Sequence, residues 1–109
     1  MPKKGRKPIL NPPGNRWFVY LLRCGDGSLY AGIAKDVDRR CKRHNAGTAS
    51  RYTRSRLPVV VVYREAHTSR SLALSREAAI KALTRQQKEA LIRLPDEDDL
   101  FNEWGIRPW

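Results

Sequence analysis

The chain has 109 residues, of which 40% are hydrophobic; this supports one modest core and excludes a second domain or a deep cavity between domains. It carries 22 Lys and Arg residues against 11 Asp and Glu residues, so its net charge is +11. Such an excess attracts polyanions, because phosphate groups neutralise it and release counterions. Nucleic acid is therefore the expected class of partner.

Residues 1–15 contain four Pro, two Gly and several basic residues, a composition that predicts a flexible basic arm. This segment has no apolar stretch typical of a signal peptide, and no apolar run in the chain approaches the roughly 18–20 residues of a membrane helix. Cys24 and Cys41 are too few for a disulfide framework and form no zinc-binding pattern. We therefore expect a cytoplasmic protein with two reduced thiols and no membrane contact.

Three segments are rich in aromatic and branched residues and predict strands. The first two, residues 17–23 and 29–33, are separated by a turn that holds Gly25 and Gly27, which predicts a β-hairpin. Residues 57–64 form the third segment, and their four consecutive valines predict a strand buried on both faces.

A helix is predicted between Asp36, a good N-cap, and Gly47, a good helix end. At about 100° per residue, Cys41 and His44 share one face of this helix, and Arg40 lies beside them. An Arg on the inward side of a short helix is unexpected as packing, because a buried guanidinium requires an anionic partner. Arg40 therefore needs a structural or functional reason.

The segment at residues 48–56 predicts a polar, basic loop in which cationic and aromatic side chains alternate. Such alternation favours contacts with phosphates and bases, with a plain solvated loop as the alternative. We expect the nucleic-acid contacts to come from this loop and from the helix before it, through Lys35, Arg39, Lys42, Arg43, Arg51, Tyr52, Thr53 and Arg54.

A long helix is predicted from Ser69 or Ser71 to about residue 83, with Glu77 on the flank of its apolar stripe. The expected stripe consists of Leu72, Ala79, Ile80 and Leu83. Residues 84–87 then resemble a capping box that opens a last helix, and Pro95 ends it.

The predicted order is β-β-α-β-α-α, which gives an α+β fold with a three-stranded, mainly antiparallel sheet flanked by helices. We expect the domain to occupy residues 16–94. We expect residues 95–109 to form an acidic C-terminal tail, because this segment contains five acidic residues and one Arg. The acidic run at residues 96–99 has no spacing that would bring metal ligands together.

Tyr20 and Tyr30 lie ten residues apart across the predicted hairpin, so they can approach each other on one face. Arg40 and His44 follow on the next helix, and Glu77 lies on the later one. This set, in this order, resembles the GIY-YIG nuclease family, and above all its small stand-alone members. The resemblance covers about residues 17–94. It implies an endonuclease that hydrolyses phosphodiester bonds of DNA, with repair or recombination as its setting and RNA as an open alternative substrate.

The sequence departs from the family pattern at three positions. Phe18 stands where the family name has Gly, and Ala31 stands where it has Ile; both look like packing positions. Ile33 stands where many members have a basic residue directly after the second Gly of the motif, with Lys35 nearby.

The resemblance also implies roles for single residues. One of the two tyrosines, Tyr20 or Tyr30, helps to activate the attacking water with assistance from His44, and Arg40 contacts the scissile phosphate. Glu77 holds one divalent ion, Mg²⁺ or Mn²⁺, a choice that suits a shell of carboxylate, water and phosphate. Because a tyrosine of pKa ~10 is a poor base in water, a nearby cation must lower its pKa, and Arg40 or the metal is the expected cation.

Other hypotheses remain beside the endonuclease. Arg40 and Glu77 could form a structural ion pair, and His44 could be an ordinary core or capping histidine. The fold would then be a catalytically silent nucleic-acid binding module. A third hypothesis is a structural protein whose acidic tail docks on a partner.

Overall fold

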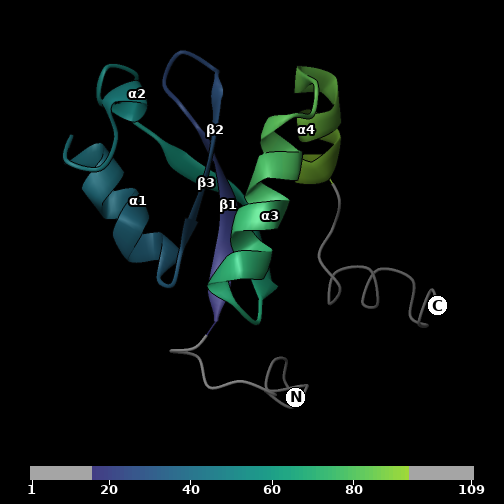
Figure 1. The fold of residues 1–109 in the computed structure, drawn as a ribbon. Coiled ribbons are helices and arrows are strands. Elements are labelled where there is room, and N and C mark those ends of the chain that lie inside the picture. The colour runs from purple at the N-terminus through teal and green to yellow at the C-terminus, as the bar shows by residue number, and fades with distance from the viewer. Residues whose placement is uncertain (1–15, 94–109) are drawn as a thin grey trace, which may run out of the picture.

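The computed structural model describes residues 16–93, so the predicted arm at 1–15 and tail at 95–109 lie outside the described residues. Three strands and four helices follow one another along the chain (Figure 1). They are β1 (Trp17–Arg23), β2 (Leu29–Ala34), α1 (Val37–Asn45), α2 (Arg51–Arg54), β3 (Val60–His67), α3 (Arg70–Lys81) and α4 (Arg85–Arg93).

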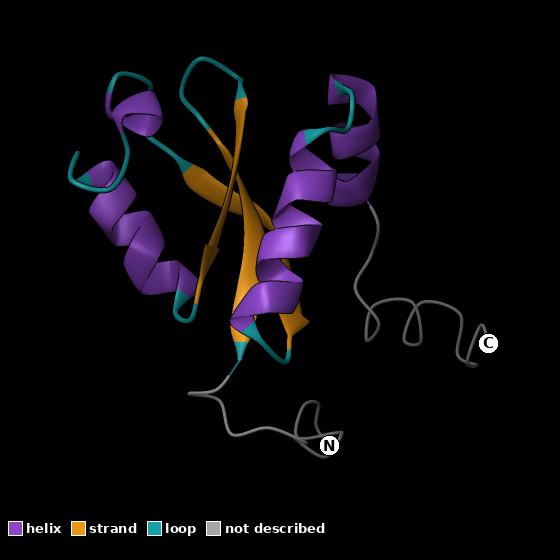
Figure 2. Cartoon of the chain, in the orientation of Figure 1, coloured by secondary structure: helices purple, strands orange, loops and turns teal. Residues whose placement is uncertain are grey.

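The sheet has the strand order β2-β1-β3, and β1 pairs antiparallel with both neighbours. Helices α1 and α2 cover one face of the sheet, and α3 and α4 cover the other (Figure 2). The predicted α+β class, with a three-stranded antiparallel sheet flanked by helices, is therefore confirmed. None of the described helices is both long and apolar enough to cross a membrane.

The central strand β1 is buried on both faces because each face carries a helical layer. Tyr20 and Leu22 point toward α1, whereas Val19 and Leu21 alternate with them and point toward α3. The hairpin that joins β1 to β2 turns at Gly27, whose φ of 87° lies in the left-handed region that favours glycine.

The third strand differs from its prediction. It begins at Val60, three residues later than expected, and it lies at an edge of the sheet. Val59 is 2% exposed, but Val60 is 55% exposed, so burial on both faces is wrong. The physical reason is the position of the strand, because the helices cover the central strand more completely than its outer neighbour.

Helix α3 starts where the sequence predicted, since the Ser69 hydroxyl accepts a hydrogen bond from the Leu72 amide at 3.1 Å. Its predicted apolar stripe is partly wrong. Leu72 is 52% exposed and Ala79 is exposed, whereas Ala73 and Ile80 are fully buried against the sheet. Glu77 lies between these two buried residues at helical spacing, and its side chain is 16% exposed. The carboxylate therefore lies on the inner face of α3 and not on a flank.

Two local features concern the helix starts. The capping box before α4 is confirmed, because the Thr84 amide donates to Gln87 Oε1 at 2.9 Å and the Gln87 amide donates to Thr84 Oγ1 at 3.1 Å. The predicted loop at residues 48–56 contains one unpredicted helical turn, α2, which the Ser50 side chain caps.

Glu65 ties the edge strand β3 to α3. Its carboxylate accepts hydrogen bonds from Arg76 Nε at 2.8 Å, from His67 Nε2 at 2.7 Å and from the Tyr63 hydroxyl. Burial opposes ionisation, but the hydrogen bonds from these three partners hold the pKa of Glu65 below its usual value.

Replacing Glu65 with Gln is expected to lower the free energy of unfolding by about 1.5–3 kcal/mol at neutral pH, because charged hydrogen bonds are lost. Since the folded pKa is depressed, the wild type keeps this stability above the ordinary pKa of Glu and loses it as the pH falls through the depressed value. Urea denaturation of both proteins between pH 7 and about pH 3 checks this. The expectation would be contradicted if the difference in free energy of unfolding between the two proteins did not become smaller in acid.

Candidate functional site

Tyr20 on β1 pairs with Gly32 on β2 in the register of the hairpin. A Cβ at position 32 would lie 2.6 Å from the Tyr20 hydroxyl oxygen and 2.7 Å from its Cζ. No side chain fits there, so glycine is required for the tyrosine to reach its place. Tyr20 is 1% exposed, and this close approach fixes its ring on the α1 side of the sheet.

The Tyr20 hydroxyl lies 3.0 Å from Nε2 of His44, and the other ring nitrogen of His44, Nδ1, lies 2.8 Å from Oγ1 of Thr53. His44 and Thr53 are both fully buried. Burial lowers the pKa of His44, and the positive charges of Arg40 and Arg43 lower it further. At neutral pH the imidazole is therefore uncharged, with one nitrogen free to accept a proton.

Aromatic side chains cover the outer side of this histidine. The Tyr30 ring meets the His44 ring edge-on, with centroids 5.1 Å apart, and stacks on Tyr52 at 5.8 Å. The Arg56 guanidinium lies 3.9 Å from the centre of the Tyr52 ring. The structure therefore brings Tyr20, Tyr30 and His44 together, as the sequence predicted, with Tyr52 stacked on Tyr30 and Arg56 on Tyr52.

The ionisation of Tyr20 differs from the expectation. Burial, together with the neighbouring Tyr30 and the charge of Glu77, raises the pKa of Tyr20 to about 12, although Arg40 opposes this. The expected lowering by a cation does not outweigh desolvation here. Tyr20 is therefore a protonated hydroxyl at neutral pH, suited to share its proton with His44.

Arg40 lies half-buried on the inner side of α1, as its helical phase predicted. Within residues 16–93 no carboxylate lies at salt-bridge distance from it, and its buried Nε has no hydrogen-bond partner there. Glu77 instead meets Lys81 Nζ at 3.3 Å. The alternative of a structural Arg40–Glu77 ion pair is therefore not what this structure contains.

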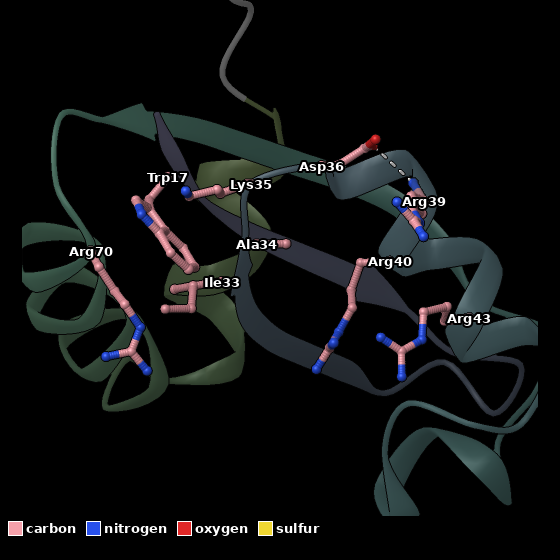
Figure 3. A pocket seen from close by; sticks show the side chains of 9 residues that line it. All are labelled: Trp17, Ile33, Ala34, Lys35, Asp36, Arg39, Arg40, Arg43 and Arg70. Carbon is pink, nitrogen blue, oxygen red and sulfur yellow. Dashed lines mark hydrogen bonds between the residues drawn. The ribbon is translucent and has the colours of Figure 1, made fainter. Parts of the chain in front are cut away.

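An open pocket of about 490 Å³ lies between the start of α1 and the start of α3. Figure 3 shows Arg40 and Arg43 extending from α1 on one side, with Trp17 and Arg70 on the other. The lining holds five basic side chains and one acidic side chain: Lys35, Arg39, Arg40, Arg43 and Arg70, with Asp36. This charge makes the pocket a site for anions.

Among the other predicted contact residues, Tyr52 is 38% exposed and stacks on Tyr30, and the rest divide into two groups. Lys42, Arg51 and Arg54 are exposed on α1 and α2, free to meet a nucleic acid beyond the pocket. Thr53 is different, because its side chain is 0% exposed, which speaks against a direct contact with nucleic acid.

Trp17 and Arg70 were missed by the sequence reasoning. Trp17 opens β1 and Arg70 opens α3, and their ring and guanidinium come within 5.7 Å only through tertiary packing. Lys35 Nζ lies 5.4 Å from the same ring. A single basic residue in the first turn of a helix carries no sequence signal of its own.

Glu77 belongs to the layer on the opposite face of the sheet from α1, yet its charge reaches the Tyr20 hydroxyl. Among the described residues no three His, Cys, Asp or Glu side chains gather into a metal-binding group. A single partly buried carboxylate fits an ion such as Mg²⁺, which keeps several waters and takes one or two protein carboxylates plus phosphate oxygens.

A family model described as the GIY-YIG catalytic domain matches residues 16–90 of the chain. The chain belongs to the GIY-YIG family. A UPF0213 protein of Streptococcus sanguinis is 51% identical over 79 residues, which cover 72% of this chain and 91% of that protein. A UPF0213 protein of Staphylococcus epidermidis is equally similar, with 72% and 96% covered. These relatives are small single-domain GIY-YIG proteins, as the sequence resemblance implied.

Two solution NMR structures are similar to this GIY-YIG chain. The UPF0213 protein from Bacillus halodurans is 43% identical, with 71% of this chain and 82% of that chain covered and a TM-score of 0.46. A protein from E. faecalis is also 43% identical, with 69% and 80% covered and a TM-score of 0.49.

The GIY-YIG motif positions now have physical roles. The sequence resemblance assigns Tyr20, Tyr30 and Gly32 to the motif, and the Tyr20 ring packs closely on Gly32. Phe18 packs against the core on the α1 side, and Ala31 is buried on the α3 side. Both departures from the motif are packing positions, as the sequence indicated.

Proposed function

We propose that this GIY-YIG domain is a metal-dependent endonuclease that hydrolyses phosphodiester bonds of DNA. The observation that carries the proposal is a neutral, buried His44 that is hydrogen-bonded to Tyr20. Beside it, in a strongly basic pocket, lies Arg40, which meets no carboxylate of residues 16–93. Phosphodiester hydrolysis is helped by a group that accepts the proton of the attacking water and by a cation that meets the phosphate.

The proton path uses the hydrogen bond between Tyr20 and His44. As a water attacks phosphorus, its proton passes to the Tyr20 oxygen while the Tyr20 proton passes to Nε2 of His44. The oxygen of the water bonds to phosphorus, and the leaving oxygen departs with the electron pair of the broken P–O bond and takes a proton from solvent. Tyr20 never needs to exist as a free phenolate, so its pKa of about 12 is no obstacle.

Arg40 would neutralise the negative charge that develops on the non-bridging phosphate oxygens. No carboxylate of residues 16–93 competes for its guanidinium, so a phosphate can meet it without breaking an ion pair in that part of the chain. Glu77 would hold one Mg²⁺ or Mn²⁺, which when bound supplies further charge stabilisation at the phosphate.

The second candidate function is a catalytically silent nucleic-acid binding module. The burial of Tyr20 favours it, since the hydroxyl lies under β2 and α1 in a residue that is 1% exposed. In this case the pocket binds phosphate, and the Tyr20–His44 bond serves only stability.

A panel of labelled substrates tests the proposal: single strands, duplex, flaps, branched DNA and matched RNA, each incubated with Mg²⁺, with Mn²⁺ or with EDTA. We expect cleavage of at least one DNA structure that stops in EDTA and returns when metal is added. Preference for flaps or branches would indicate a repair or recombination setting. Binding without cleavage under every metal condition would favour the silent module.

A single charge reversal in the pocket should reveal which side chains bind phosphate. We expect Arg39→Glu to weaken DNA affinity and to flatten its dependence on salt by about one slope unit for each phosphate that the protein no longer neutralises. Arg93→Glu on α4 is the matched control, because it makes the same charge change outside the pocket. Fluorescence anisotropy between about 50 and 200 mM salt measures both slopes. Equal salt dependence of DNA affinity in the two variants would show that Arg39 does not contact a phosphate.

A further inference from the structure

We propose that Thr53 is the positioning residue of this site: its hydroxyl holds the His44 ring so that Nδ1 carries the proton and Nε2 faces Tyr20. This inference rests on the proposed function for its catalytic consequence, but the geometry it describes can be tested without activity. Thr53 acts through His44 and touches no substrate, because its side chain is fully buried.

The donors available at Thr53 and Tyr20 determine the direction of the two hydrogen bonds to His44. The Thr53 hydroxyl donates to the Ser50 carbonyl at 3.4 Å, so its lone pairs are left to accept from Nδ1–H of His44 at 2.8 Å. In a neutral imidazole the second nitrogen is then an acceptor, and the Tyr20 hydroxyl donates to it at 3.0 Å.

The charge of Arg40 favours the same direction. This cation acts on the Tyr20 oxygen and stabilises negative charge there. A cation that stabilises an electron-rich Tyr20 oxygen favours Tyr20 as the donor of the hydrogen bond to His44. A histidine protonated at Nε2 would instead have to donate to Tyr20, and it could not accept a proton from it.

The short helix α2 is what brings Thr53 to the histidine. The Ser50 side chain caps this helix by accepting from the amides of Tyr52 at 3.1 Å and Thr53 at 3.4 Å. The same turn carries Tyr52, which stacks on Tyr30 at 5.8 Å. One turn of four residues thus supports His44 directly through Thr53 and indirectly through the aromatic rings.

The direct test is ¹⁵N NMR of the imidazole nitrogens in the full chain at neutral pH. The chain has two histidines, so His67→Gln assigns the signals of His44. We expect wild-type His44 to carry its proton on Nδ1, and Thr53→Val, which keeps the shape but removes the hydroxyl, to shift population to the Nε2–H form. Thr53→Ser should restore the wild-type pattern. An Nε2–H tautomer in the wild type would overturn the inference, whether or not the protein cleaves DNA.

Kinetics give the functional part of the test. On a cleaved DNA substrate we expect Thr53→Val to lose roughly 10–100-fold in cleavage rate with unchanged DNA affinity, the usual effect of losing a ligand-orienting partner. Thr53→Ser should recover most of that rate. Full activity of Thr53→Val would overturn the positioning role. If Thr53→Val does not fold, the wild-type tautomer and the Thr53→Ser rate still decide the matter.

Discussion

Replacing Arg40 with Ala is expected to slow cleavage by about 10²–10³-fold while leaving the fold nearly as stable as before. A buried arginine with a carboxylate partner would cost about 3–5 kcal/mol to remove, because the carboxylate would be left unpaired. Among residues 16–93 Arg40 has no such partner, and its Nε is buried without a hydrogen bond. We therefore expect the free energy of unfolding to change by less than about 1 kcal/mol.

The cleavage rate of Arg40→Ala should fall by about 10²–10³-fold, the usual effect of losing one preorganised group at a developing anion. Arg40→Lys is an informative partner, since it keeps the charge but loses the forked donor geometry, and it should recover only part of the rate. Arg93→Ala on α4 is the control for a general loss of charge. The melting temperature and the single-turnover cleavage rate, measured on the same preparations, show the effect of each variant on stability and on catalysis. A large loss of stability in Arg40→Ala would point to a structural arginine and to the silent module.

The second large effect is expected for Tyr20→Phe. This change leaves the ring over Gly32 but removes the hydroxyl that bonds His44. We expect cleavage to fall by about 10²–10⁴-fold, the range for loss of a general acid–base group. The free energy of unfolding should fall by about 1–3 kcal/mol, because Nε2 of His44 loses its partner. Tyr30→Phe is the matched control: the Tyr30 ring meets His44 edge-on, so we expect a smaller effect.

The pH dependence separates this proton path from a structural bond. Burial and the charges of Arg40 and Arg43 lower the pKa of His44, so the neutral form persists below the usual range of histidine. Cleavage by the wild type should hold at neutral pH and disappear only as the pH falls through this depressed value. The residual rate of Tyr20→Phe should lack this acid limb. An acid limb of the same shape in both proteins would contradict the relay.

The features that the sequence predicted correctly are those that depend on residues close together in the chain. Asp36 and Ser69 cap their helices as expected, and Thr84 closes its capping box with Gln87, because these bonds involve neighbours in the chain. The proximity of Tyr20 and Tyr30 followed from the hairpin. These features need no knowledge of how distant segments pack.

The errors concern tertiary packing. On α3 the sequence predicts Ile80 and Leu83 of the apolar stripe correctly, but the helix buries Ala73 in place of Leu72. Glu77 therefore lies between buried Ala73 and Ile80 and not on a flank. The sequence predicts a polar loop around Thr53, because nothing in the neighbouring residues indicates that α2 turns its side chain toward His44. The raised pKa of Tyr20 reflects burial, which a motif does not reveal.

The central claim is tested most directly by comparing wild type with Glu77→Ala in a single-turnover cleavage assay with Mg²⁺, on the labelled DNA structure that is cut best. The two proteins are purified identically, which controls for a contaminating nuclease, and DNA affinity and melting temperature are measured on the same samples. The account predicts metal-dependent cleavage by the wild type and at least a roughly 10²-fold slower rate for Glu77→Ala, with DNA binding retained. Equal cleavage by both proteins, or tight binding by the wild type without any cleavage, would contradict it.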